Sequence, residues 1–232
     1  MVEMDRPLVS VIVAVSDGER YLSFALNSIF RQNYCPVQVI VIDGQSVDDT
    51  AAIAQSFESI KYICQAGHGL ANGRNAGIEA ASGEFIAFLD ADDIWMPDKL
   101  HVQIGYLMRN PEIQYVNAWV QLFTDTECHR RSGYTQKFIE QAHIGRTPGT
   151  LVARKSTFDV VGPFSPDFRI ACDAEWFVRA NACKLSMFII PKVLLHKRIH
   201  NANLSSNVGA NRQELMTVIR QSIMRRRRGL MR

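Results

Sequence analysis

Phe85-Ile86-Ala87-Phe88-Leu89-Asp90-Ala91-Asp92-Asp93 decides the fold, because five consecutive apolar residues end in three carboxylates within four positions. An apolar run of this length is typical of a strand buried on both faces of a parallel sheet. The carboxylates then lie at the carboxyl end of the strand, where open α/β sheets bind ligands. Three neighbouring carboxylates repel one another unless a cation or hydrogen bonds compensate, and such oxygen ligands suit Mg²⁺ or Mn²⁺. The alternative is an acidic loop that caps the next helix.

Strands and helices alternate around this stretch. Continuous β-branched runs predict buried strands at residues 8–15, 37–42 and 60–64, and turn residues after each lead into helical patterns near 22–30, 48–57 and 72–81. Asp48 is placed to cap the second of these helices. This alternation predicts an α/β fold with a parallel sheet joined by right-handed crossovers.

The second half has weaker patterns. We expect a helix after Pro97 with Leu100, Ile104, Leu107 and Met108 on one face, ended by Asn110-Pro111. Residues 114–123 predict an edge or antiparallel strand, 125–146 a loop with some helix, 150–153 a strand and 173–182 a helix. Residues 187–196 predict a last strand, which Pro191 confines to an edge or a bulge.

Composition favours one soluble domain. The 232 residues are 21% charged and 47% hydrophobic, as in ordinary globular proteins. Six of the 26 Lys and Arg residues lie between Arg220 and Arg232, so without that tail the balance is 20 minus 23, or −3, and we expect no binding to nucleic acid. The five cysteines have no CxxC spacing, and neither a signal peptide nor a membrane-spanning run is recognisable. A reducing, cytoplasmic location is expected.

Three loops are expected to converge at one edge of the sheet: residues 14–19, 43–50 and 90–93. A carboxylate there, such as Asp43, can accept a hydrogen bond from a nucleobase or a ribose, although Asp also ends many strands as a turn residue. Arg74 and Asn75, in the first turns of their helix, could hold a phosphate with the helix-end N–H groups; the alternative is a surface arginine. Neither GxGxxG nor GxxxxGKS/T is present, which argues against dehydrogenases and P-loop enzymes.

These motifs together resemble those of a family 2 glycosyltransferase with the GT-A fold. The resemblance covers roughly the first hundred residues and rests on 9–14, 17–22, 39–50, Arg74-Asn75-Ala76-Gly77-Ile78 and 83–93. Residues 162–164 and 168–179 resemble the acceptor-side motif of the family, and Arg198-Ile199-His200-Asn201-Ala202-Asn203-Leu204-Ser205 resembles its C-terminal motif.

The resemblance implies inverting transfer of one sugar from a nucleotide-diphosphate-sugar, most often a UDP-sugar, to a carbohydrate or lipid-linked acceptor. Asp173 is the implied general base. Asp92, with Asp90 and His200, is implied to hold Mn²⁺ or Mg²⁺, which would stabilise the charge on the leaving diphosphate. On sequence alone, Asp173 also suits a helix cap and His200 a surface position. The implied nucleotide-sugar pocket comprises Ala14, Ser16, Glu19, Asp43, Gln45, Asn72, Arg74, Asp90 and Ala91.

The chain departs from the family pattern at several positions. Ala14 and Ser16 stand where a proline and an aromatic are usual, Gly44 replaces an Asp, Asp49 a Gly, and Cys172 an acidic residue. These departures favour, as an alternative, a catalytically silent nucleotide-sugar-binding module with the GT-A fold. A sugar nucleotidyltransferase would need a Gly-rich triphosphate loop after the first strand, which Ser16-Asp17-Gly18 does not provide. The QxxRW motif of processive synthases is absent, so single-sugar transfer is expected.

We divide the chain into a catalytic domain, residues 1–204, and a C-terminal helix with a basic tail, residues 205–232. The catalytic domain comprises a nucleotide-binding half, about residues 1–100, and an acceptor half, about 101–204. In the tail, Leu215, Val218, Ile219 and Ile223 follow a helical period before four consecutive arginines. Such a segment could lie peripherally on the inner face of an anionic membrane that holds a lipid-linked acceptor; the alternative is a solvated end.

Overall fold

Four parallel strands form the first half of the sheet in the computed structural model, which describes residues 6–124, 135–200, 203–204 and 208–229. They run in the order β3 (Ile60–Cys64), β2 (Val37–Asp43), β1 (Val9–Val15) and β4 (Phe85–Phe88). Because all four are parallel, the loops that follow them meet at one edge of the sheet. The predicted α/β fold with a parallel sheet is therefore confirmed for this half.

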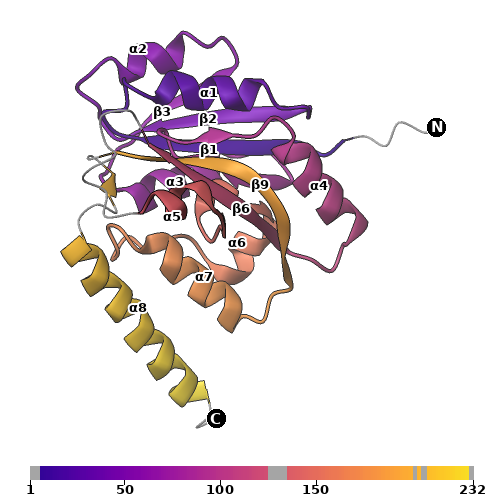
Figure 1. Cartoon of the computed structure of the whole chain (residues 1–232), viewed down its shortest axis with the longest axis vertical. Helices are drawn as coiled ribbons and strands as arrows, with labels where there is room; N and C mark the ends of the chain where they lie inside the picture. The colour runs from indigo at the N-terminus through magenta and orange to yellow at the C-terminus, as the bar shows by residue number, and fades with distance from the viewer. Residues whose placement is uncertain (1–5, 125–134, 201–202, 205–207, 230–232) are drawn as a thin grey trace.

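Helices cover both faces of these strands (Figure 1). On one face α1 (Leu22–Phe30) and α2 (Thr50–Gln55) pack against the alternate residues of β1 that begin with Val9. On the other face α3 (Leu70–Ala80) lies over Ile12. Gly77 permits this close approach, because a Cβ there would lie 2.3 Å from Cγ2 of Ile12.

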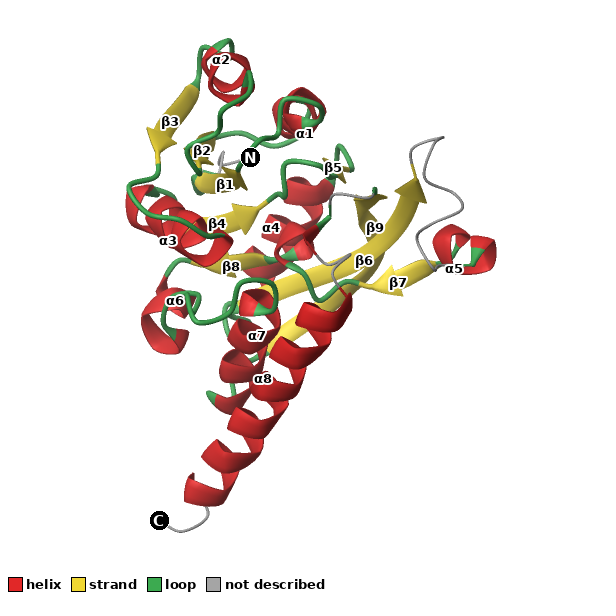
Figure 2. Cartoon of the chain, turned by 90° about the vertical axis from the view of Figure 1, so that its left-hand side faces the viewer, coloured by secondary structure: helices red, strands yellow, loops and turns green. Residues whose placement is uncertain are grey.

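The second half extends the sheet with mixed strand directions (Figure 2). Its strands are β5 (Ile94–Trp95), β6 (Tyr115–Thr124), β7 (Ala142–Ile144), β8 (Val152–Arg154) and β9 (Met187–Ile199), and the order continues from β4 as β8-β6-β9-β5, with β7 on β6. The remaining elements are α4 (Lys99–Arg109), α5 (Gln136–Glu140), the 3₁₀ turn η1 (Pro148–Thr150), α6 (Ser156–Val161), α7 (Cys172–Ala182) and α8 (Val208–Gly229).

Several predictions for this half change in detail. Strand β6 is not an edge strand, because it lies between β8, to which it is antiparallel, and β9, to which it is parallel. The register of β9 shifts between Ile190 and Val193, so the bulge expected at Pro191 is confirmed. Met108 is 41% exposed, in contrast to the other apolar residues expected on that face of α4. Of the expected loop, residues 125–134 lie outside the described part of the chain.

Helix α8 projects from the body of the molecule, with the C-terminus at its far end (Figure 2). Its contact with the body involves α7 and buries Val218, whereas Leu215, Ile219 and Ile223 of the expected apolar face are exposed. Only one side of α8 is therefore used for packing. In the described part of the chain, no helix is both long and apolar enough to cross a membrane.

Candidate functional site

The loops after β1 and β2 are joined by hydrogen bonds that involve both backbones. The N–H of Asp17 donates to Oγ of Ser46 at 2.9 Å, and the Asp17 carboxylate accepts the N–H of Val47 at 3.0 Å. Glu19 donates its N–H to Asp48 and accepts the N–H of Asp49 at 3.2 Å. Glu19 thus connects the two loops, and the expected convergence is observed here.

Asp43, at the end of β2, has an exposed fraction of only 2%. Its Oδ1 accepts the N–H and the hydroxyl of Ser46 at 2.9 and 2.6 Å, and its Oδ2 accepts the hydroxyl of Tyr62 at 2.7 Å. The hydrogen bond to Asp43 and burial raise the pKa of Tyr62 to about 12. Asp43 is therefore held in one orientation at the edge of the sheet.

The prediction that Asp48 caps α2 is wrong by one position, because Asp48 lies one residue before the N-cap. Its Oδ1 accepts the N–H of Thr50 at 3.0 Å, while Asp49 occupies the N-cap without a side-chain cap. The helix ends at Gln55, so Phe57 lies beyond it.

The acidic stretch after β4 receives its partners from the C-terminal end of β9 and the residues that follow. Oδ2 of Asp92 lies 2.9 Å from Nε2 of His200 and accepts an amide N–H of Asn203 at 2.9 Å. Asp93 is fully buried, and its Oδ1 accepts the N–H of Arg198 at 2.9 Å. The carboxylates are thus compensated by a segment distant in sequence.

Lys197 lies between one carboxylate oxygen of Asp90 and one of Asp93. Its Nζ is 3.7 Å from Oδ2 of Asp90 and 3.5 Å from Oδ2 of Asp93. The neighbouring carboxylates raise the pKa of Lys197, which therefore stays an ammonium at neutral pH. Burial alone would raise the pKa of Asp90, but the cations Arg74 and Lys197 outweigh it and lower that pKa.

Arg74 connects the acidic stretch to α7. It is 3% exposed, which excludes the alternative of a surface arginine. One guanidinium nitrogen donates to Oδ1 of Asp90 at 2.8 Å and another lies 3.6 Å from Sγ of Cys172. The guanidinium also lies over the ring of Phe164 at 5.5 Å. Because α3 begins at Leu70, Arg74 lies in its second turn.

Asp173 follows Cys172 and is the second residue of α7. The helix N-cap is Ala171, so Asp173 is not the cap; its Oδ1 accepts the N–H of Ala174 at 2.7 Å. Burial raises the pKa of Asp173 and Arg74 opposes the shift, while Asp90 and Lys197 also act on it electrostatically. Asp173 therefore belongs to the same charged neighbourhood as the acidic stretch.

The remaining predicted pocket residues lie around this edge. Ala14 is half-buried near the end of β1, while Ser16, Gln45 and Asn72 are exposed. Gln45 has a positive φ of 65° and donates from its amide to O of Gln65 at 3.1 Å. The amide of Asn72 donates to O of His68, and Ala91 is half-buried in the acidic turn.

Two cationic residues of the cluster were absent from the sequence-based site. These are Lys197, and Arg198, whose Nε donates to O of Asp92 at 3.0 Å and whose guanidinium lies 4.4 Å from the ring centre of Tyr21. Arg198 opens the C-terminal motif quoted above, whereas the only signal for Lys197 was its place beside that motif, in a strand with no acidic partner nearby in sequence.

The donor set fits Mg²⁺ or Mn²⁺. Asp92 and His200 approach each other to 2.9 Å, and carboxylate and imidazole are ligands that Mn²⁺ accepts. Within the described ranges, no group of three or more His, Cys, Asp or Glu residues is arranged to hold a metal ion. Such ions usually take one or two carboxylates plus substrate phosphates, so two or three protein ligands suffice.

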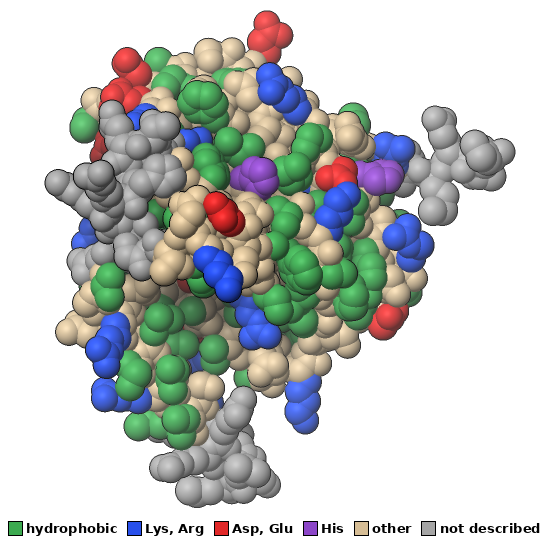
Figure 3. All heavy atoms as spheres, viewed as in Figure 1, with side chains coloured by type: hydrophobic (Ala, Val, Ile, Leu, Met, Phe, Trp, Pro, Cys, Tyr) green, Lys and Arg blue, Asp and Glu red, His purple; other side chains and the backbone are tan. Residues whose placement is uncertain are grey.

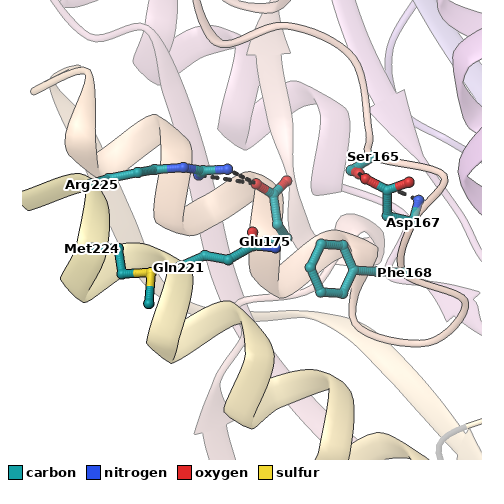
Figure 4. A pocket seen from close by; sticks show the side chains of 7 residues that line it. All are labelled: Ser165, Asp167, Phe168, Glu175, Gln221, Met224 and Arg225. Atoms are coloured by element: carbon teal, nitrogen blue, oxygen red, sulfur yellow. Dashed lines mark hydrogen bonds and ion pairs between the residues drawn. The ribbon is translucent and has the colours of Figure 1, made fainter. Parts of the chain in front are cut away.

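A cavity of about 280 Å³ lies elsewhere, between α7 and α8 (Figure 4). In it Arg225 of α8 pairs with the buried Glu175 at 3.2 Å. Its lining contains none of the predicted site residues. We therefore place the candidate site at the acidic stretch, where charged groups from both halves of the chain meet.

Comparison with known proteins points to one family. Residues 10–173 match the family described as "Glycosyl transferase family 2". An uncharacterized glycosyltransferase from Nostoc sp. is 40% identical over 219 residues, covering 84% of this chain and 66% of the relative. The UDP-Glc:alpha-D-GlcNAc-diphosphoundecaprenol beta-1,3-glucosyltransferase WfgD of Escherichia coli is 37% identical over 110 residues, covering 46% of this chain and 44% of WfgD. The chain thus spans less than two thirds of the length of these relatives.

Solved structures share the fold. The mannosyltransferase PcManGT from Pyrobaculum calidifontis, in complex with GDP-Man and Mn²⁺, superposes with a TM-score of 0.73 at 19% identity, over 95% of this chain and 65% of PcManGT. S. aureus TarS 1-349, in complex with UDP-GlcNAc, gives a TM-score of 0.70 at 20% identity, over 86% of this chain and 60% of that one. At these identities the likeness concerns the fold.

Proposed function

The chain belongs to glycosyl transferase family 2 and has the GT-A fold, and from this premise we propose that it is an inverting glycosyltransferase. It moves one sugar from a nucleotide-diphosphate-sugar to an acceptor hydroxyl. The observation that carries the proposal is the bridge formed by Arg74, which binds Asp90 at 2.8 Å and lies against Cys172, next to Asp173. In the proposed enzyme, Arg74 would thus keep Asp90, near the diphosphate, close to the base Asp173.

We assign the base to Asp173. The acceptor oxygen bonds to the anomeric carbon, the bond from that carbon to the diphosphate oxygen breaks, and the acceptor proton passes to the Asp173 carboxylate. Burial raises the pKa of Asp173, which makes it a stronger base. The N–H of Ala174 orients the carboxylate.

Asp92, Asp90 and His200 would hold Mn²⁺ or Mg²⁺, which when bound neutralises charge on the leaving diphosphate. Asp43 would contact the base or ribose of the nucleotide, because its orientation is fixed by Ser46 and Tyr62. Support for a UDP-sugar comes from the UDP-Glc in the name of WfgD. The complex of PcManGT with Mn²⁺ supports the ion.

Turnover of sugar nucleotides tests this proposal. The protein should release UDP from UDP-Glc or UDP-GlcNAc with Mn²⁺ and a lipid-linked carbohydrate acceptor. Asp173→Asn should bind UDP normally but lose turnover, whereas Asp159→Asn, at an exposed position on α6, should keep it. Normal UDP binding without turnover in the wild type, together with no effect of Asp173→Asn, would instead identify a binding module.

We further propose that α8 lies on an anionic membrane at its inner face, where a lipid-linked acceptor would be held. WfgD acts on a diphosphoundecaprenol-linked sugar, which supports an acceptor of this class. The face of α8 away from the body carries Leu215, Met216, Ile219 and Ile223, which are 38–50% exposed. Figure 3 shows hydrophobic and basic side chains together on this helix. Arg212 and Arg220 flank the apolar stripe and are exposed, which suits lipid headgroups of negative charge.

Vesicle sedimentation tests the membrane contact. The protein should sediment with phosphatidylcholine vesicles only when they contain phosphatidylglycerol, and the double variant Ile219→Ser, Ile223→Ser should weaken this binding. Val160→Ser, at an apolar position on α6 that is 60% exposed, serves as the control. Concentration-dependent dimers that disappear in the double variant, without vesicle binding, would show that a second copy covers the helix instead.

A further inference from the structure

Lys197 lies beside two carboxylate oxygens of the acidic stretch that the hydrogen bonds described above do not engage. Asp92 is bound by His200 and Asn203, and Oδ1 of Asp90 by Arg74. Oδ2 of Asp90 and Oδ2 of Asp93 both face the Lys197 ammonium, at 3.7 and 3.5 Å. One ammonium therefore serves two carboxyl groups.

The backbone fixes this position. Strands β5 and β9 pair antiparallel, with Ile94 opposite His196 and Trp95 opposite Leu195. Extending that register by one residue places Lys197 opposite Asp93, which agrees with the hydrogen bond from the Arg198 N–H to Asp93. Strand pairing therefore fixes the position of the Lys197 side chain beside Asp93.

Asp93 is the more deeply buried of the two carboxyl groups beside the ammonium. Its side chain is fully buried, and its Oδ2 has no hydrogen-bond partner in the described part of the chain. Burial raises the pKa of this carboxyl group to about 8 and the Lys197 ammonium opposes the shift, because a buried carboxylate is costly unless a cation compensates it. Lys197 supplies that cation, and its side chain is 26% exposed.

We propose that Lys197 is a positioning residue that acts as a built-in counter-cation of Asp90 and Asp93. It holds the acidic stretch together before a divalent ion binds, and it competes with that ion for Asp90. This inference rests on the proposed function only in that Asp90 and Asp92 are taken as ligands of the ion. A protein that lacks this ammonium should bind Mn²⁺ more tightly, and in the absence of Mn²⁺ it should be less stable than the wild type.

Binding of Mn²⁺ alone, followed by the electron paramagnetic resonance signal of the free ion, tests the proposal without any transfer assay. Lys197→Met should bind Mn²⁺ about tenfold more tightly than the wild type, because removal of one charge about 4 Å from a ligand changes the attraction for a dication. Its melting temperature in EDTA should fall and should recover with Mn²⁺. Lys197→Arg keeps the charge and should retain the wild-type affinity.

A second comparison tests the effect of Lys197 in a background that lacks the buried carboxyl group of Asp93. Asp93→Asn removes the buried carboxyl, and the double variant Asp93→Asn, Lys197→Met should bind Mn²⁺ about tenfold more tightly than Asp93→Asn alone. Equal or weaker Mn²⁺ binding after loss of Lys197, in either background, overturns the proposal. So does an absence of Mn²⁺ binding in all variants. Tight binding without sugar transfer would instead contradict the proposed function and leave the role of Lys197 intact.

Discussion

Glu214 of α8 accepts the backbone N–H of Ala171, two residues before Asp173, at 2.8 Å. The same carboxylate accepts the N–H of Ile170 at 2.8 Å and that of Arg169 at 3.2 Å. One side chain of the C-terminal helix therefore holds the whole backbone turn that leads into α7. The helix that we place on the membrane is thus tied to the segment that carries the proposed base.

Glu214→Ala should lower kcat about tenfold with little change in KM for the donor, because a misplaced base slows the chemical step more than nucleotide binding. Steady-state kinetics with donor and acceptor measure both constants. Glu214→Gln, which keeps one oxygen acceptor, should recover part of kcat. Gln213→Ala is the control on an exposed neighbour, and an equal loss in that variant would mean that α8 acts only through general stability.

Arg74→Met should destabilise the fold by about 3 kcal/mol, since loss of the guanidinium leaves Oδ1 of Asp90 without its partner and only Lys197 to compensate that carboxylate. This value is at the low end of the range for removing one partner of a buried ion pair, because the Asp90 side chain is 25% exposed. Adding Asp90→Asn to this variant should recover part of the loss. Denaturant titration gives the free energy of unfolding, and strictly additive effects of the two substitutions would contradict an energetically important pair.

The parallel half of the sheet could be predicted from the sequence because its long buried strands are recognisable as continuous apolar runs. Residues 8–15 and the stretch that ends in Asp90 predicted buried parallel strands, and the observed pairing of β1 with β4 brings their loops together. The contact of Lys197 with Asp93 was not predictable, since it depends on β5, which has two residues and hence no periodicity. Glu214 was missed for a similar reason: its partners are backbone N–H groups, which leave no trace in the sequence.

Tyr62→Phe should weaken UDP binding several-fold while lowering stability by about 1 kcal/mol, because Oδ2 of the buried Asp43 loses its hydrogen-bond partner. Isothermal titration with UDP and denaturant titration give the two quantities. Tyr106→Phe, in a half-buried ring stacked on Phe188, is the matched control and should leave UDP binding unchanged. An unchanged UDP affinity in Tyr62→Phe would argue against a role of Asp43 in nucleotide binding.

Lys99→Met should stabilise the protein at neutral pH. Lys99 on α4 is fully buried, with Nζ 4.3 Å from the ring centre of Trp95 and 2.5 Å from Oε1 of Gln103. Burial lowers the pKa of Lys99 well below 10.5, so the native state binds this proton less strongly than the unfolded chain does. The proton bound by the unfolded chain then costs stability at neutral pH.

The sign of the pH dependence follows from this difference. Between the lowered native pKa and 10.5 the unfolded state binds more protons at Lys99, so wild-type stability should rise with pH relative to Lys99→Met. The advantage of the variant should therefore narrow as pH rises from 7 toward 10, in denaturant titrations of both proteins at each pH. Because Gln103 loses its partner in Lys99→Met, this narrowing, and not the absolute difference, identifies the titration of Lys99. A difference that stays constant over the range would show that Lys99 keeps its charge in the native protein.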